Sequence, residues 1–101
     1  MKIVNETEFK DIVKEGVTLV DFFATWCGPC KALAPVLEEL SAQYPNVNFI
    51  KVIVDESENL ASEYGIMSIP TVLVFKNGEL VKQNVGFMSP QAVNSLVDSV
   101  L

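Results

Sequence analysis

The sequence predicts a mixed α/β fold, in which a central β-sheet of about five strands carries helices on both faces. Apolar segments typical of strands alternate with helical segments along residues 1–70. The pair Asn77-Gly78 then separates two more strand-like segments, and Asn-Gly is the strongest short signal for a hairpin. Hairpin strands are antiparallel, whereas strands joined by crossover helices are parallel, so both kinds of pairing are expected.

The N-terminal quarter of the chain is expected to form two strands and one helix. Residues 3–4 form a short first strand, and Asn5 followed by Glu8 has the pattern of a capping box, which begins a helix. Residues 18–24, TLVDFFA, are apolar on both alternating faces apart from Asp21. Such a segment is typical of a central strand that is buried on both sides.

A long amphipathic helix is predicted after the two cysteines, Cys27 and Cys30. Its apolar side chains recur at helical spacing over Leu33, Val36, Leu37, Leu40 and Tyr44. Pro35 lies inside this pattern, where a proline usually kinks a helix. The cysteine pair is therefore expected at a junction between a strand and a helix.

The second half is predicted to continue with strands, a short helix and a closing helix. Residues 47–55 form a buried strand, residues 59–65 a short helix ended by glycine, and residues 71–85 the two hairpin strands. Ser89 and Pro90 supply the N-cap and first turn of the last helix. The buried face of that helix is expected to consist of Val93, Leu96, Val97 and Val100. The expected order is β-α-β-α-β-α-β-β-α.

Composition and charge restrict the class of protein. The chain of 101 residues is expected to form one domain over residues 1–101 and to act as a monomer. Its net charge of −6, with seven scattered basic residues, disfavours nucleic acid as a partner. No signal peptide and no run of about 20 apolar residues is present, so we expect no membrane association and a cytoplasmic location.

The spacing of the two cysteines favours redox chemistry. A disulfide between residues three apart stabilises a fold by only roughly 2 kcal/mol, and the cytoplasm disfavours structural disulfides. After Cys27 has attacked a target disulfide, however, Cys30 is held within reach of the mixed disulfide and can displace the product. A zinc site needs four ligands, and two thiols without any histidine do not provide them, so no metal is expected.

The helix start identifies the attacking cysteine. Unpaired backbone N–H groups and the positive end of the helix dipole stabilise a thiolate there, so Cys27 is the expected nucleophile. We expect Cys27 to be exposed and Cys30 to lie one helical turn inward. Asp21 lies among apolar neighbours in the strand that leads to the cysteines. It is expected to be buried and to transfer protons, the alternative being an exposed acid at a strand end.

A longer set of motifs resembles the thioredoxin family across essentially the whole chain. WCGPCK follows VDFFAT, and SIPT, FKNGE and VGF come later in the same order as in the family. A lone Cys-x-x-Cys is a weak signal, but this combination is a strong one. The resemblance implies the thioredoxin fold. Gly28 and Pro29 between the cysteines resemble the reducing members rather than the oxidising isomerases, which usually have a histidine there.

The resemblance also implies residue roles around the disulfide. Cys27 matches the attacking cysteine and Cys30 the buried resolving cysteine. Pro70 matches a proline that follows a cis peptide bond and faces the disulfide, where Ile69 offers backbone groups to an extended substrate. Gly86 matches the glycine that lets the substrate backbone approach.

Three further positions are implied by the same resemblance. Trp26 matches the aromatic residue beside the site, although core packing is the alternative. Asp21 matches the buried acid behind the cysteines, and Lys51 the lysine near that acid. An ordinary solvated strand lysine remains the alternative for Lys51. The expected rim, which binds substrate, consists of Trp26, Gly28, Pro29, Ile69, Pro70, Gly86 and Phe87.

Three residues depart from the commonest family pattern. Phe23 stands where a second tryptophan is usual, Ile53 where asparagine is common, and Phe87 where alanine is frequent. None of them touches the sulfur chemistry directly, so these departures bear on partner choice at the rim.

The resemblance implies a protein-disulfide reductase without a cofactor of its own. It passes two electrons to disulfide-containing proteins and is reduced again by a flavoprotein, thioredoxin reductase. A different class remains open, in which the fold serves as a redox-independent binding or structural subunit. A variant with both cysteines replaced by serine distinguishes the two classes.

Overall fold

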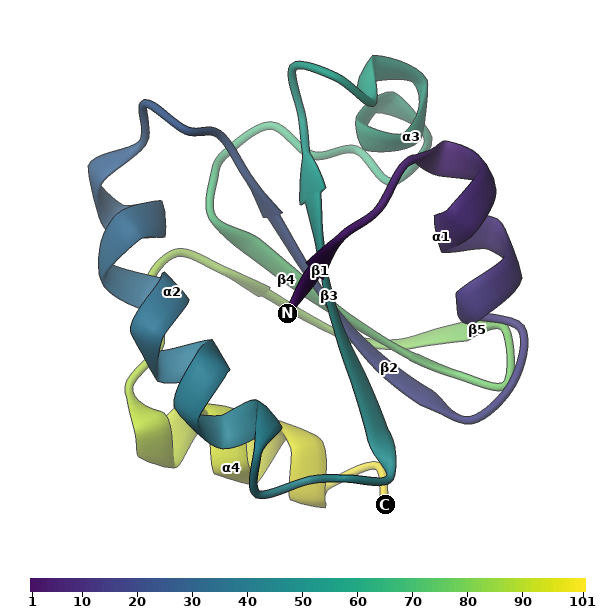
Figure 1. The fold of residues 1–101 in the computed structure, drawn as a ribbon, viewed down its shortest axis with the longest axis vertical. Coiled ribbons are helices and arrows are strands. Elements are labelled where there is room, and N and C mark those ends of the chain that lie inside the picture. Colours follow the sequence, from purple (N-terminus) through teal and green to yellow (C-terminus); the bar gives the residue numbers. More distant parts are fainter.

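Five strands form one mixed sheet, and four helices cover its two faces (Figure 1). The computed structural model describes residues 1–101. In chain order the elements are β1 (Lys2–Ile3), α1 (Glu6–Ile12), β2 (Val17–Phe23), α2 (Gly28–Ser41), β3 (Val47–Ile53), α3 (Glu58–Glu63), β4 (Thr71–Lys76), β5 (Glu79–Val85) and α4 (Pro90–Asp98). The predicted fold class and order of elements are confirmed.

The sheet has the strand order β1-β3-β2-β4-β5. β3 pairs in parallel with both β1 and β2, whereas β4 is antiparallel to β2 and to β5. β2 therefore lies in the middle, and all seven of its residues are buried. The expectation of a central strand buried on both sides is confirmed.

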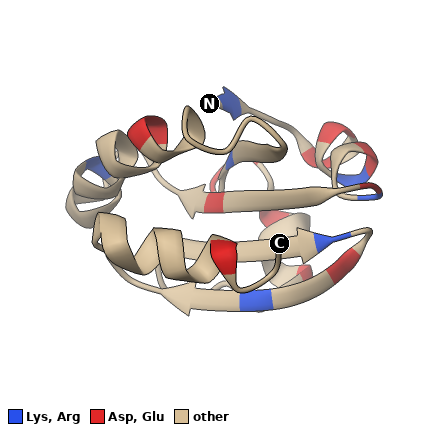
Figure 2. Cartoon of the chain, turned by 90° about the horizontal axis from the view of Figure 1, so that it is seen from below, with Lys and Arg blue, Asp and Glu red and all other residues tan.

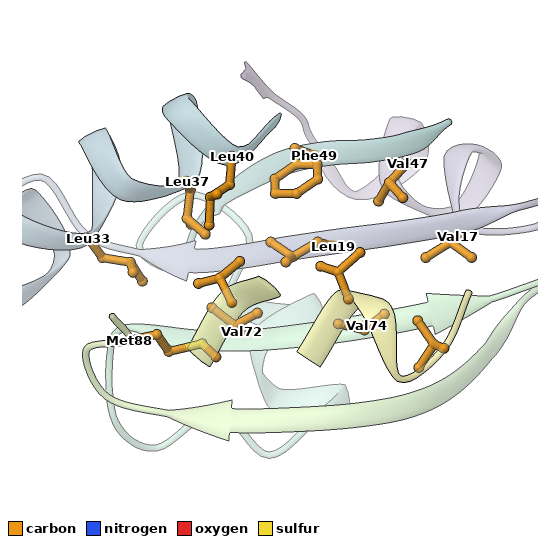
Figure 3. Close-up of a cluster of buried hydrophobic side chains, with 13 residues drawn as sticks. Val17, Leu19, Leu33, Leu37, Leu40, Val47, Phe49, Val72, Val74 and Met88 are labelled. Carbon is orange, nitrogen blue, oxygen red and sulfur yellow. The ribbon is translucent and has the colours of Figure 1, made fainter. Parts of the chain in front are cut away.

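Apolar side chains from the helices cover each face of the sheet. α2 and α4 lie on one side and α1 and α3 on the other (Figure 1). On the first side Leu33, Leu37 and Leu40 of α2 point toward the strands (Figure 3). On the second side the ring of Phe9 in α1 meets those of Phe22 and Phe75 edge to face. The sheet thus carries a closely packed apolar cluster on each face.

Local capping and turn chemistry sets where several elements begin and end. The backbone N–H of Glu8 donates to Asn5 Oδ1 over 2.8 Å, and the N–H of Asn5 donates to Glu8 Oε1 over 3.0 Å, so the capping box is confirmed. Ser89 Oγ accepts from the N–H of Ala92 at the start of α4. Asn77 and Gly78 have φ values of 51° and 86°, which the hairpin turn requires. α2 continues through Pro35.

The seven basic residues are spread over several elements (Figure 2). Several have an acidic neighbour, such as Lys2 with Glu8 and Lys10 with Glu6. The surface therefore carries no continuous basic stripe of the kind that polyanions recognise. None of the helices is long and apolar enough to cross a membrane.

Replacing Leu37 with alanine is expected to lower the free energy of unfolding by about 3 kcal/mol. The Leu37 side chain is fully buried between α2 and the sheet, so truncation leaves a cavity. Urea melts of Leu37→Ala and Leu80→Ala measure the effect. Leu80 on β5 is 40% exposed, and its truncation is expected to change the free energy much less. Equal losses in the two variants would contradict this placement of the core.

Candidate redox site

The cysteine pair lies where β2 leads into α2. Cys27 is the N-cap of the helix, with extended backbone angles, and Gly28 and Pro29 form the first two positions. Proline is well tolerated there because its missing N–H would have no partner inside the helix. The N–H of Cys30 points to Cys27 Sγ at 3.2 Å. The sulfur therefore occupies the place that a capping oxygen takes in other helices.

Cys27 and Cys30 form a disulfide, with their Cα atoms 5.3 Å apart. Both residues are buried, Cys27 at 5% and Cys30 at 3% exposure. The expectation that Cys27 is exposed is therefore wrong for this oxidised state. The reason is packing, because Cys27 joins Cys30 in a small apolar cluster with Phe23 and Ala24, and Ile69 packs against this cluster.

The loop before β4 faces the disulfide. The Ile69–Pro70 peptide bond is cis, which confirms the expectation drawn from the resemblance. The carbonyl oxygen of Ile69 lies 3.9 Å from Cys27 Sγ. Gly86 follows β5 and donates its N–H to the carbonyl oxygen of Pro70 over 2.8 Å. The segment before β4 thus meets the sulfur of Cys27, and Gly86 in turn bonds to that segment.

Large apolar side chains around this site are exposed. Trp26 is 68% exposed and Phe87 53%, so neither side chain packs in the core. The Trp26 Nε1–H donates to Asp55 Oδ2 over 2.9 Å. Met67, two residues before Ile69, is 95% exposed.

Two residues beside the expected site were not expected there: Asp55, which bonds to Trp26, and the exposed Met67. The signal for Asp55 is its position just beyond the carboxyl end of β3, since parallel β2 and β3 end at the same edge of the sheet. Residues 54–55 were predicted within that strand, but β3 ends at Ile53. Met67 could have been found because it is a large apolar residue in the loop between Gly65 and Pro70, where such a side chain is expected to be exposed.

Asp21 lies in the middle of the sheet with no exposed surface, and neither carboxylate oxygen has a hydrogen-bond partner. Burial raises the pKa of Asp21 to about 6, and the positive charge of Lys51 partly opposes that rise. The predicted burial is confirmed. Lys51 is the residue opposite Asp21 in the parallel β2–β3 register.

Lys51 is half-buried, and it does not form an ion pair with Asp21. Its Nζ lies 4.4 Å from the centroid of the Phe23 ring. A cavity of about 210 Å³ opens beside these side chains, and Cys30 forms part of its lining. The lining residues are Phe23, Ala24, Thr25, Cys30, Lys31, Ala34 and Lys51. No group of three or more Cys, Asp or Glu side chains is gathered as metal ligands would be.

This arrangement defines a class of protein. A disulfide that caps a helix can be reduced to two thiols, of which the N-terminal one is stabilised as a thiolate. The second thiol stays one helical turn away and can close the disulfide again. The fold and the site together are those of a thiol–disulfide oxidoreductase.

Comparison with known proteins gives the family. The thioredoxin family model matches residues 1–99. The chain is 48% identical to the thioredoxin of Bacillus subtilis, with full coverage of both chains. It is 46% identical to that of Staphylococcus saprophyticus over 97% of this chain and 95% of the relative. A solved Plasmodium falciparum thioredoxin has a TM-score of 0.93 and 41% identity, with both chains fully covered.

The chain therefore belongs to the thioredoxin family. It is a protein-disulfide reductase whose redox pair is Cys27 and Cys30.

Proposed function

We propose that the chain reduces disulfides in cytoplasmic proteins and that a thioredoxin reductase returns the Cys27–Cys30 pair to the dithiol. The observation that carries this proposal is the position of Cys27 Sγ at the N-cap of α2, within 3.2 Å of the N–H of Cys30. Free N–H groups and the helix dipole favour negative charge at that sulfur. Cys27 is thus the nucleophile in the reduced protein.

The reaction proceeds in two exchanges. The Cys27 thiolate attacks one sulfur of the substrate disulfide, so a mixed disulfide forms and the other substrate sulfur leaves as a thiolate, which takes up a proton. Cys30 then loses its proton, attacks Cys27 Sγ and releases the second substrate thiolate. Two electrons have passed to the substrate, and the Cys27–Cys30 disulfide remains. The second exchange is intramolecular because both cysteines belong to the same chain, and their Cα separation of 5.3 Å keeps Cys30 within reach of Cys27.

Asp21 is proposed to accept the proton of Cys30, acting through a water molecule. The chain contains no histidine, and a carboxyl group with a pKa of about 6 is a suitable base near neutral pH. Residues two apart on a strand share a face, so Asp21 and Phe23 point to the same side, where Phe23 packs with Cys30. Lys51, opposite Asp21 in the sheet, moderates its charge.

The substrate is proposed to bind as an extended segment that pairs its backbone with that of Ile69. The Ile69 carbonyl oxygen lies 3.9 Å from Cys27 Sγ, so a segment paired there would present its disulfide to that sulfur. Gly86 has a φ of +98° and open space where a side chain would be, which lets another backbone approach. The rest of the rim consists of Trp26, Gly28, Pro29, Pro70 and Phe87.

Replacing Phe87 with alanine is expected to reduce the rate with protein disulfides about fivefold, because an exposed aromatic side chain supplies apolar contact to a docked partner. Reduction of a small aromatic disulfide is expected to stay nearly unchanged. Insulin and a second protein substrate are compared with the small disulfide, and Leu80→Ala, on the exposed face of β5, is the control. If the rate fell equally with the protein disulfides and with the small disulfide, Phe87 would support the fold and not substrate recognition.

The proposal as a whole is tested by NADPH-coupled reduction of insulin with thioredoxin reductases. The chain is expected to turn over many times, and the double variant Cys27→Ser, Cys30→Ser to be inactive. If the double variant retained full biological activity in cells, a redox-independent binding role would replace the proposal. We also propose that residues 1–101 act as one domain and as a monomer, which sedimentation equilibrium checks.

A further inference from the structure

Lys51 and Asp21 are partners in the sheet, yet they form no ion pair. Partner residues on parallel strands point to the same face. The ammonium of Lys51 instead lies over the Phe23 ring, 4.4 Å from its centroid. Both oxygens of the Asp21 carboxylate remain without a hydrogen-bond partner. A buried acid and its neighbouring cation are thus kept apart where a contact would be expected.

The other elements around Asp21 offer no competing charge in the sheet. On β4 the residue opposite Asp21 is Val72, and the buried residues of α4 are valines. From α2, Lys31 and Cys30 line the same cavity as Lys51, and Lys31 is exposed. Apart from the thiol of Cys30, Lys51 is therefore the ionisable group best placed to change the charge of Asp21.

We infer that Phe23 is a positioning residue, whose ring holds the Lys51 ammonium away from Asp21 and so keeps that carboxyl group basic enough to accept a proton. An aromatic face attracts an ammonium within about 6 Å, and partial burial strengthens the attraction. The inference rests on the proposed role of Asp21 as proton acceptor. It also assigns a function to one position at which the chain departs from the common family pattern, which has tryptophan.

Replacing Phe23 with leucine is expected to lower the pKa of Asp21 by about half a unit, because the released ammonium can approach the carboxylate. Phe23→Trp, which provides a stronger ring, is expected to raise it. The pKa is measured from the carboxyl ¹³C shift of Asp21 by NMR in the oxidised protein, where no thiol titrates. If Phe23→Leu does not fold, Phe23→Trp still tests the inference. A lower pKa of Asp21 in Phe23→Trp than in the wild-type chain would overturn it.

The matched control is the same pair of substitutions in a Lys51→Met background. Without the ammonium, Phe23→Leu and Phe23→Trp are expected to leave the pKa of Asp21 unchanged. A shift of the same size in this background would mean that the ring acts by excluding water, and the inference would be wrong. The inference would also be overturned if Phe23→Leu raised the pKa of Asp21 only when Lys51 is present. The ring would then hold the lysine close to the acid.

A kinetic readout separates this inference from the proposed function. Stopped-flow resolution of a mixed disulfide is followed against pH in Phe23→Leu, and its profile is expected to move with the pKa of Asp21. An unmoved pKa overturns the inference. If the pKa of Asp21 moves while the pH profile of the rate does not, Asp21 is not the proton acceptor, and Phe23 does not contribute to catalysis through it. The same result would still confirm that the ring positions Lys51.

Discussion

The Cys27→Ser variant is expected to lose disulfide reduction entirely, whereas Cys30→Ser is expected to accumulate mixed disulfides with its substrates. A serine hydroxyl at position 27 is not ionised near neutral pH and cannot attack a disulfide. In Cys30→Ser the first exchange still takes place at the N-cap sulfur, but no second thiol is present to release the product. The two substitutions therefore stop the reaction at different steps.

Insulin reduction and mass spectrometry of the trapped species measure this difference. Both variants should unfold at nearly the same urea concentration as the reduced wild-type chain, which controls for loss of fold. Peptide mapping of the wild-type intermediate is expected to place the substrate on Cys27. Adducts on Cys30 would reverse the two roles.

The Asp21→Asn variant is expected to be more stable than the wild-type chain at neutral and alkaline pH. The pKa of Asp21 is about 6 in the fold, against an ordinary value of about 3.9 in the unfolded chain. Below about pH 3 the acid is protonated in both states, so its raised pKa has no effect. As the pH rises to about 6, the unfolded chain ionises first, and the wild-type fold loses stability. Above about pH 7 that loss is complete, at roughly 3 kcal/mol.

Urea melts of the oxidised proteins between pH 4 and pH 8 measure this effect. The difference in free energy of unfolding between Asp21→Asn and wild type is expected to grow up to about pH 7 and then stay constant, since the amide does not ionise. Asp11→Asn is the matched control, because the side chain of Asp11 is 83% exposed. A difference that does not change with pH would contradict a raised pKa for Asp21.

The same variant is expected to slow the second exchange by about tenfold or more near neutral pH, where the Cys30 thiol is mostly protonated and needs a base. At alkaline pH the rates of the two proteins should converge, because the thiol then ionises without help. Stopped-flow resolution of a preformed mixed disulfide measures both regimes. Unchanged resolution at every pH would assign the proton acceptor to solvent.

The sequence alone was sufficient for those features that depend on neighbouring residues. Capping of the first helix depends on Asn5 and Glu8, which are three residues apart. The hairpin depends on Asn77 and Gly78, which adopt positive φ at low cost. The cysteine pair could be placed between a strand and a helix because both elements have their own periodic pattern. The cis bond before Pro70 was different, since only the family resemblance indicated it.

The tertiary structure decided most of the contacts between distant side chains. Local patterns do not determine that β2 lies between β3 and β4, and only the family resemblance indicated that Lys51 lies near Asp21. They also did not indicate that packing buries Cys27, that Trp26 bonds to Asp55, or that the Lys51 ammonium lies over Phe23. Such contacts depend on which strands pair and on how neighbouring side chains fill the space between sheet and helices, and both are properties of the whole packed chain.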